Sequence, residues 1–243
     1  SPLRDVYKRQ LMSNPIKHHL QMKAKSIFIS AFSLVSVFAF SQKKVEAKKQ
    51  DSAKWKYTPN FIIGADVLNL GAAFFGDRKL YQGFVSSRIS RKIHAVVDLG
   101  YDKNIYQKNG YDAKADGLFL KAGGFYMLAS DPENAFNGFY AGAKLAGSFY
   151  SQEYSAIPVK GRNNEGITIA LEPSTQSSYW VEAVLGARIQ VFESNFFIDV
   201  NAQPRYLAYT TKQDEITPMI VPGFGRSSGS FSMGFSWSIA YKF

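Results

Sequence analysis

The stretch Phe231-Ser-Met-Gly-Phe-Ser-Trp-Ser-Ile-Ala-Tyr-Lys-Phe243 alternates without interruption between large apolar side chains and small or polar ones. Successive side chains of a β-strand point to opposite faces, so all the large apolar groups share one face. A face made only of such groups requires an apolar medium. The stretch therefore predicts a strand with lipid on one side; the alternative is the last strand of a soluble β-sandwich.

Part of this stretch resembles the C-terminal signature strand of bacterial outer-membrane β-barrels, which ends in an aromatic residue. In that class of protein the strand is read by the outer-membrane insertion machinery. The resemblance implies that the machinery is a partner of this chain and that Phe243 is its last residue. The residues expected to form the insertion signal are Phe235, Trp237, Ile239, Tyr241 and Phe243.

Upstream of this stretch, the chain divides from Asn60 onward into eight alternating segments, each followed by turn residues. Eight is an allowed number of strands for a membrane barrel, and no helical periodicity competes over comparable lengths. We therefore expect an all-β fold, an eight-stranded antiparallel up-and-down transmembrane β-barrel over residues 59–243. The expected strands are 60–70, 80–90, 93–102, 117–128, 138–150, 178–191, 196–208 and 231–243.

The connections between these segments alternate in length. Three of them, 103–116, 151–177 and 209–230, are long and polar, and short turns lie between them. In outer-membrane barrels the short turns face the periplasm and the long loops face outward. The order of the connections therefore predicts that both ends of the barrel domain lie on the periplasmic side.

One face of every expected strand carries no charged residue, and in the first strand this face consists of Ile63, Ala65 and Val67. Aromatic side chains stand at both ends of this face, as expected of the girdles at the two membrane interfaces. Membrane lipid is therefore an expected partner. The girdle residues are Tyr101, Phe149, Tyr179 and Tyr206 at the loop ends and Phe139, Phe196, Tyr241 and Phe243 at the turn ends.

The opposite face collects the charged residues. An eight-stranded barrel is only wide enough for its inward side chains to fill it, so charges there must pair or hydrogen-bond. We expect a structural ion-pair network in a non-conducting interior; the alternative is a narrow ion or proton channel lined by the same residues. The expected members are Asp66, Arg88, Asp98, Lys121, Lys144, Glu182, Arg188, Asp199 and Arg205.

The N-terminal part of the sequence predicts export. Residues 22–41 combine a basic start, an apolar stretch too short to span a bilayer as a helix, and small residues at Ala39 and Ser41, as in a cleaved Sec signal peptide. Residues 1–21 fit neither a signal peptide nor a domain and are interpreted as a sequencing adapter or other upstream artefact. The chain has no cysteine, which excludes disulfides and a lipoprotein anchor at the cleavage site.

Much of the positive charge lies in this leader. The whole chain has 29 Lys and Arg against 19 Asp and Glu, but without residues 1–41 the balance falls to 23 against 18. Six of the remaining lysines gather in residues 42–58, which predict a flexible basic periplasmic segment. A nucleic-acid site would need basic residues interleaved with aromatic ones on a folded surface, which this segment lacks, so a nucleic-acid partner is not expected.

Motifs for catalysis are sparse, and the sequence favours a protein that is not an enzyme. His94, the only histidine after the leader, is interpreted as a buried side chain paired with a carboxylate such as Asp98. Metal-ligand spacing and phosphate-binding loops are lacking, so neither a metal nor a cofactor is expected. Pro204 cannot donate to a strand ladder; it predicts a bulge or, alternatively, a lateral opening of a membrane-embedded lipid-modifying enzyme.

Two further stretches carry a family resemblance. Residues 179–191 (Tyr-Trp-Val-Glu-Ala-Val-Leu-Gly-Ala-Arg-Ile-Gln-Val) and the run Ile220-Val-Pro-Gly-Phe-Gly-Arg226, together with the terminal strand, resemble a family of small bacterial outer-membrane β-barrels defined only as a domain of unknown function. The resemblance covers residues 57–243. It implies the fold and an outer-membrane location, and it transfers no functional residue.

These observations predict a small monomeric outer-membrane barrel with a structural role or a binding role in its loops. Loops on rigid scaffolds carry most binding functions, so the long connection 151–177 is the first place to expect an extracellular ligand. Its Ile167–Leu171 run is also interpreted as an extension of the sixth strand above the membrane.

Overall fold

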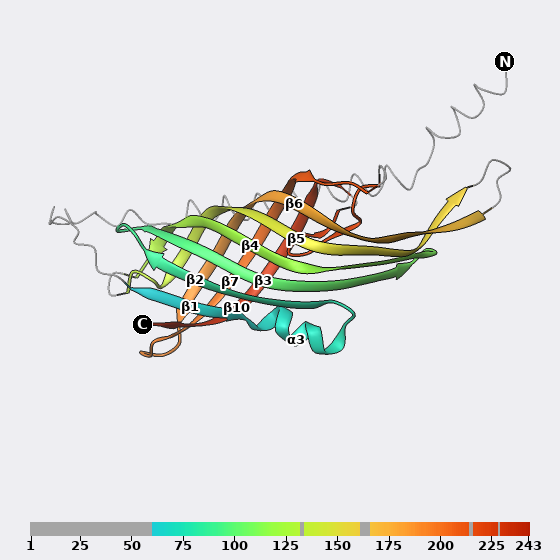
Figure 1. Ribbon diagram of the computed structural model, residues 1–243. Helices are drawn as coiled ribbons and strands as arrows, with labels where there is room; N and C mark the ends of the chain where they lie inside the picture. The colour runs from blue at the N-terminus through green and yellow to red at the C-terminus, as the bar shows by residue number, and fades with distance from the viewer. Residues whose placement is uncertain (1–59, 132–133, 161–165, 214–215, 228) are drawn as a thin grey trace, which may run out of the picture. The chain divides into compact units, whose positions relative to one another are not determined.

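The computed structural model describes residues 60–243, except 132–133, 161–165, 214–215 and 228. The expected upstream artefact, signal peptide and basic segment all lie outside the described residues. Eight antiparallel strands form a closed barrel in the order β1-β10-β7-β6-β5-β4-β3-β2. Each strand lies beside its neighbours in sequence, and the last closes on the first, which confirms the predicted eight-stranded up-and-down barrel (Figure 1).

The strands differ greatly in length. The barrel strands are β1 (Phe61–Asp66), β2 (Lys79–Arg88), β3 (Ile93–Lys108), β4 (Tyr111–Ser130), β5 (Gly138–Lys160), β6 (Gly166–Gln190), β7 (Phe196–Thr210) and β10 (Phe231–Lys242). One helix and a small two-stranded sheet interrupt them: α3 (Val67–Phe75), β8 (Ile220–Val221) and β9 (Gly225–Arg226). No helix in the described part of the chain is long and apolar enough to cross a bilayer.

The predicted two faces of the wall are present. Large apolar side chains point out of the barrel and stay exposed, for example Leu145 at 71% and Phe235 at 62%. Rows of aromatic rings lie near both ends of this outer face, such as Phe196, Tyr241 and Phe243 at the turn end. An apolar belt around a closed strand ring is stable only in a bilayer. The protein is therefore a membrane-spanning barrel of the bacterial outer membrane.

The first strand is shorter than predicted, and the expectation of an outward strand residue at Val67 is wrong. β1 ends at Asp66, whose carboxylate accepts a hydrogen bond from the Asn69 backbone N–H (3.2 Å) and caps α3. A carboxylate in this position satisfies one of the unpaired N–H groups of a helix start. The apolar run after Asp66 has no strict alternation, so the cap determines its conformation.

Two of the long connections are mainly strand. β3 and β4 continue through 103–116 to a two-residue turn at Asn109 and Gly110, both with positive φ (57° and 80°). Such a turn matches the twist of the flanking strands. β5 and β6 likewise continue into 151–177, and the predicted extension of the sixth strand through Ile167–Leu171 is confirmed. These hairpins reach beyond the rest of the barrel (Figure 1).

The third long connection folds inward. In 209–230, which was expected to be a polar loop, Ile220, Val221 and Phe224 are buried at the loop end of the barrel against Phe119 and Trp180. We call residues 219–226 the plug. Three apolar side chains in a water-exposed loop would cost solvation free energy, and the barrel mouth gives them an apolar site.

Pro204 does not mark a bulge. The β6–β7 pairing keeps the same register on both sides of it, from Glu182 opposite Arg205 to Leu185 opposite Ala202, and the register shift lies instead at Tyr179. The pairing is interrupted only locally, because proline has no N–H to donate. A lateral opening at Pro204 is therefore not part of this fold.

The barrel wall has its irregularity elsewhere. β1 pairs with β10 only as far as Asp66, opposite Ser238. From there toward the loop end, no strand in the described part of the chain lies between residues 231–237 of β10 and 79–82 of β2, and α3 lies against both strands (Figure 1). We call this region the α3 seam.

Candidate functional site

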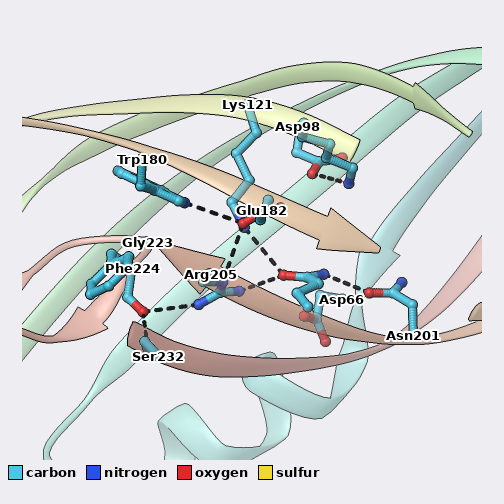
Figure 2. A network of polar contacts seen from close by, with 12 residues as sticks. Asp66, Asp98, Lys121, Trp180, Glu182, Asn201, Arg205, Gly223, Phe224 and Ser232 are labelled. Atoms are coloured by element: carbon cyan, nitrogen blue, oxygen red, sulfur yellow. Dashed lines mark hydrogen bonds and ion pairs between the residues drawn. The ribbon is translucent and has the colours of Figure 1, made fainter. Parts of the chain in front are cut away.

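Most of the predicted interior charges lie inside the barrel, where the alternation of β3 to β7 points them. Their main group forms a layer at mid-height, which we call the ion layer (Figure 2). The residues of this layer, each less than a tenth exposed, are Asp98, Lys121, Lys144, Glu182, Arg188, Asp199 and Arg205.

Glu182 is the centre of the ion layer. Its Oε2 lies 3.2 Å from Lys121 Nζ and 3.2 Å from Arg205 Nε, and the indole N–H of Trp180 donates to the same oxygen at 3.2 Å. Figure 2 shows the two cations and the indole converging on this carboxylate. Beside it, Lys144 pairs with Asp98 at 2.5 Å. In a low-dielectric interior such charges are stable only when they are paired.

Arg188 occupies the turn-side part of the layer. It pairs with Asp199 at 2.7 Å, and Asp199 also accepts a hydrogen bond from the Tyr140 hydroxyl at 2.6 Å. The guanidinium lies over the rings of Phe84 and Phe125, at 5.6 and 5.3 Å from the centroids. The cation is thus held by a carboxylate and by the faces of aromatic rings.

A polar row along β7 joins the Arg188–Asp199 pair to the cluster around Glu182. Asn201 Nδ2 donates to Asp199 at 3.0 Å, and Gln203 Nε2 donates to Asn201 Oδ1 at 2.6 Å. Gln203 Oε1 accepts from Lys121 Nζ at 3.4 Å and also from Arg205. Residues at i, i+2 and i+4 share a face of a strand, so one strand carries the whole row.

Two predicted members lie outside the ion layer. The Asp66 carboxylate is buried, but it serves as the cap of α3 and accepts a hydrogen bond from Asn69 Nδ2 at 2.6 Å. Arg88 lies at the turn end of β2 and donates to the backbone carbonyls of Ser90 and Arg91, at 3.2 and 2.9 Å. The expectation that Asp66 pairs within the interior ion layer is therefore wrong.

The plug is held by Arg205 of the ion layer and by Asp102, which the sequence did not single out. Buried Asp102 accepts from the Gly223 N–H at 2.9 Å and pairs with Arg78 at 2.6 Å. Arg205 of the ion layer donates to the Phe224 carbonyl at 3.1 Å. Gly223 has φ +78°, and a Cβ there would lie 2.5 Å from the Phe119 ring, so the position requires glycine.

The loop-side end of the plug rests on Tyr154 of β5. The Met219 N–H donates to the Tyr154 hydroxyl at 3.1 Å. Burial raises the pKa of this phenol, so the hydroxyl stays protonated and neutral.

An aromatic layer closes the turn side of the interior. Phe136, in the turn between β4 and β5, is buried beside Ile62 and Phe197.

The predicted pairing of His94 with Asp98 is wrong, because Asp98 pairs with Lys144. The His94 ring instead stacks on Phe125 at 4.9 Å, and neither ring nitrogen has a hydrogen-bond partner among the described residues.

The space left inside is small. The interior cavity bounded by ion-layer residues such as Asp98 and Lys144 has a volume of about 20 Å³, roughly enough for one water molecule. In the described residues, no group of three or more His, Cys, Asp or Glu is placed to hold a metal ion. The ion layer thus holds its charges in place with little space beside it.

The proposed insertion-signal residues alternate on the outer face of β10, with Phe235, Trp237 and Ile239 each about half exposed or more. Lipid therefore surrounds them in the folded barrel. Their role in insertion remains a prediction.

Several solved structures match the chain at low sequence identity. Neisserial surface protein A matches with 13% identity, a TM-score of 0.39 and coverage of 76% of this chain and 95% of that chain. A major outer membrane protein from Thermus thermophilus matches with 13% identity, a TM-score of 0.44 and coverage of 77% and 100%. Ail, the attachment invasion locus protein of Yersinia pestis, matches with 9% identity, a TM-score of 0.38 and coverage of 76% and 97%.

No curated protein sequence matches the chain. A protein-family comparison matches residues 24–243, a range that contains the whole barrel, the ion layer and the plug. The chain therefore belongs to the family described as Domain of unknown function (DUF6048).

Proposed function

We propose that this protein is a closed, non-conducting outer-membrane barrel that binds a partner through its β5–β6 hairpin outside the membrane. The observation that carries the proposal is strand length. β5 has 23 residues and β6 has 25, whereas a membrane-spanning strand needs roughly 9–11. More than half of each strand is therefore available beyond the hydrocarbon core.

The base of this hairpin is ordered by its own apolar cluster. Tyr154 and Ile157 are buried beside Ala113 of β4, and Met219 at the edge of the plug packs against them. The hairpin is thus continuous with the barrel wall rather than a separate loop. Binding residues are commonly presented by such rigid scaffolds.

The outer part of the hairpin exposes apolar side chains. Val159, Ile167 and Ile169 are 40%, 49% and 38% exposed, and Val159 lies opposite Ile167 in the register. β-branched side chains on a surface beyond the bilayer have no lipid to cover them. Grouped exposed apolar residues of this kind are typical of protein interaction sites.

Three features of the interior support a non-conducting barrel. The plug fills the loop side, the ion layer crosses the middle, and Phe136 with Phe197 fills the turn side. The cavity beside the ion layer is about the size of one water molecule. A permanent ion path would need a continuous water column through all three layers.

Cysteine labelling on intact cells tests the position of the hairpin. The natural chain has no cysteine, so labelling of Ile169→Cys or of Phe192→Cys reports the accessibility of that position alone. Phe192 lies in a turn at the opposite end of the barrel and is 92% exposed. A membrane-impermeant maleimide is expected to label the cysteine at 169 and to spare the one at 192. Labelling only at 192 would contradict the proposal.

Photocrosslinking tests the binding surface. The photoreactive linker is attached at Val159→Cys. With Ile167 and Ile169 unchanged, we expect one discrete adduct. When both isoleucines are replaced by serine, this adduct should be lost. Thr168→Ala is the matched control, because it changes the same strand without removing a large apolar side chain. An adduct that survives the double replacement unchanged would show that the hairpin's apolar face is not the binding surface.

Planar bilayers test the closed interior. Purified barrel is expected to give no steady single-channel current, whereas a variant in which residues 217–227 are replaced by a Gly-Ser linker should leak. A steady current from the natural chain that Lys144→Ala abolishes would contradict a non-conducting barrel and favour the channel alternative.

A further inference from the structure

The two edges of the β5–β6 hairpin differ where it extends beyond the barrel wall. On the β5 edge stands Pro158, and a Cβ at Gly110, in the turn between β3 and β4, would lie 3.6 Å from the Pro158 Cγ. Proline and a covering loop are two of the devices by which proteins block a sheet edge. The β5 edge is therefore closed at this point.

The β6 edge of the same hairpin is open. Its pairing with β7 begins at Ser178, opposite Thr210, and one further bond joins the Thr211 N–H to the Ser177 carbonyl at 2.9 Å. Beyond these contacts, residues 166–171 pair with β5 on one side, and no strand in the described part of the chain lies on the other. Such an edge presents backbone N–H and C=O groups to any chain that can pair with them.

The register identifies the groups that point to the open edge. Thr168 lies opposite Pro158, and proline has no N–H, so the two cannot form a hydrogen-bonded pair of the antiparallel ladder. Such pairs alternate along the ladder, so Thr168 and Ala170 direct their N–H and C=O groups away from β5. Glu172, two residues further, agrees with this phase. Its carbonyl accepts a hydrogen bond at 2.8 Å from Nε2 of Gln213, which follows β7 on that side.

The side chains beside this edge fit an added strand. Thr168 and Ala170 are exposed on one face, and Ile167 and Ile169 lie on the other at 49% and 38% exposed. Residues directly opposite each other in an antiparallel pair share a face, so an added strand would place every second side chain beside the two isoleucines. A segment whose alternate residues are apolar matches this surface.

We propose that the β6 edge at Thr168 and Ala170 binds an extended, alternately apolar segment of a partner protein by adding it as an antiparallel strand. This inference rests on the proposed function, because it names the way in which the hairpin holds its partner. In this mode of recognition, main-chain hydrogen bonds supply affinity and alternate side chains supply specificity.

The geometry excludes a second copy of the chain in the same membrane as the added strand. Two copies inserted in the same way direct their β6 strands in the same direction, so the strands cannot form an antiparallel pair. A symmetric parallel pair would place identical groups level with each other, with N–H facing N–H. The added strand therefore comes from another protein.

A synthetic peptide tests the edge on the natural chain. The probe is a fluorescein-labelled peptide of alternating threonine and valine with lysine at both ends, and its binding to the refolded full mature chain is measured by fluorescence anisotropy. Its valines should lie beside Ile167 and Ile169, so its threonine N–H groups should face Thr168 and Ala170. N-methylation of the threonines should weaken binding about tenfold, whereas N-methylation of the valines should change it less than about twofold.

Proline substitution tests the same edge from the protein side. Thr168→Pro removes an N–H at the open edge without removing a bond to β5, as Pro158 does on the other strand, and should weaken binding of the unmodified probe about tenfold. Ala170→Pro should have the same effect. Thr168→Ala is the matched control, because it removes the same side chain and keeps the N–H, and it should bind as the natural chain does. The heat-dependent gel shift establishes that each barrel is folded.

Three results would overturn strand addition: no saturable binding of the unmodified probe, equal weakening by the two N-methylated probes, or equal affinities of Thr168→Pro and Thr168→Ala. The two N-methylated probes act on the natural chain, so their comparison does not depend on the folding of a variant. The adduct at position 159 scores the proposed function separately. An adduct that needs Ile167 and Ile169 but survives in Thr168→Pro would keep the hairpin as the binding surface and exclude strand addition as its mode.

Discussion

The two sides of the barrel wall are held together in different ways. The ion pairs of Glu182, Asp98 and Asp199 all join strands between β3 and β7, and two of them join strands that are not adjacent in the ring. Where β10, β1 and β2 meet, the inward groups include Gly64 and Ser236, and α3 takes the place of half a strand. The first side gains stability from side-chain charge pairs, whereas the second depends on a helix cap and apolar contacts.

This difference indicates where the wall opens first. Removing one partner of a buried ion pair leaves an uncompensated charge, so the ion-layer side should resist local opening. α3 buries one residue and can detach at the loss of few contacts. Low-stability segments of this kind supply most local motions of native proteins. The seam, and not Pro204, is therefore the weak line of the barrel.

The largest effect is expected from Glu182→Gln. The substitution keeps the shape but leaves Lys121 and Arg205 buried without their shared carboxylate. Loss of one partner from a buried pair costs about 3–5 kcal/mol. The free energy of unfolding of the barrel should fall by this amount. It is measured by urea unfolding of barrel refolded into vesicles, with the heat-dependent gel shift reporting the folded fraction.

Glu153→Gln is the matched control for that measurement. Glu153 pairs with Lys114 at 3.8 Å on the surface, and the two side chains are 43% and 41% exposed. Exposed pairs of this kind contribute about 0–1 kcal/mol. Equal losses in the two variants would show that the ion layer contributes no more than a surface pair.

A smaller effect is expected from Asp102→Asn, which tests the contacts that connect β3 with Arg78 and with the plug. Asp102 accepts hydrogen bonds from Arg78 and from the Gly223 N–H. Hydrogen bonds to charged groups are worth about 1.5–3 kcal/mol. The variant should lose stability in this range and become sensitive to protease within 217–227. Asp112→Asn, at an exposed contact with Gln107, should change neither property.

The alternation of the sequence was sufficient to predict the ring and its two faces. Period-two patterns place Lys121, Glu182 and Arg205 inward whatever their partners are, because each strand has one buried face. The partners were not predictable, since some pairs join strands that are not adjacent in the ring. Lys121 on β4 thus meets Glu182 on β6, and Asp98 meets Lys144 instead of His94.

The plug and α3 were missed for different reasons. The plug had a signal, because Ile220, Val221 and Phe224 are apolar residues in an otherwise polar connection. α3 had a weaker one, since its apolar run lacks strict alternation and its start depends on a side-chain cap at Asp66. The short Asn109-Gly110 turn was a recognisable hairpin signal within a segment predicted to be a loop.

The smallest expected effect belongs to Asp66→Ala, and it separates the cap from the rest of the seam. Replacing a helix N-cap by alanine costs about 0.5–2 kcal/mol, whereas Asn caps as well as Asp. Asp66→Ala should therefore speed amide hydrogen exchange in 67–75 with little change in β4 and β5, and Asp66→Asn should behave as the natural chain. If both variants exchange faster by the same factor, the negative charge of Asp66 matters more than its cap. If exchange in β5 rises together with that in α3, the seam opens with the whole barrel, and the contrast between the two sides of the wall fails.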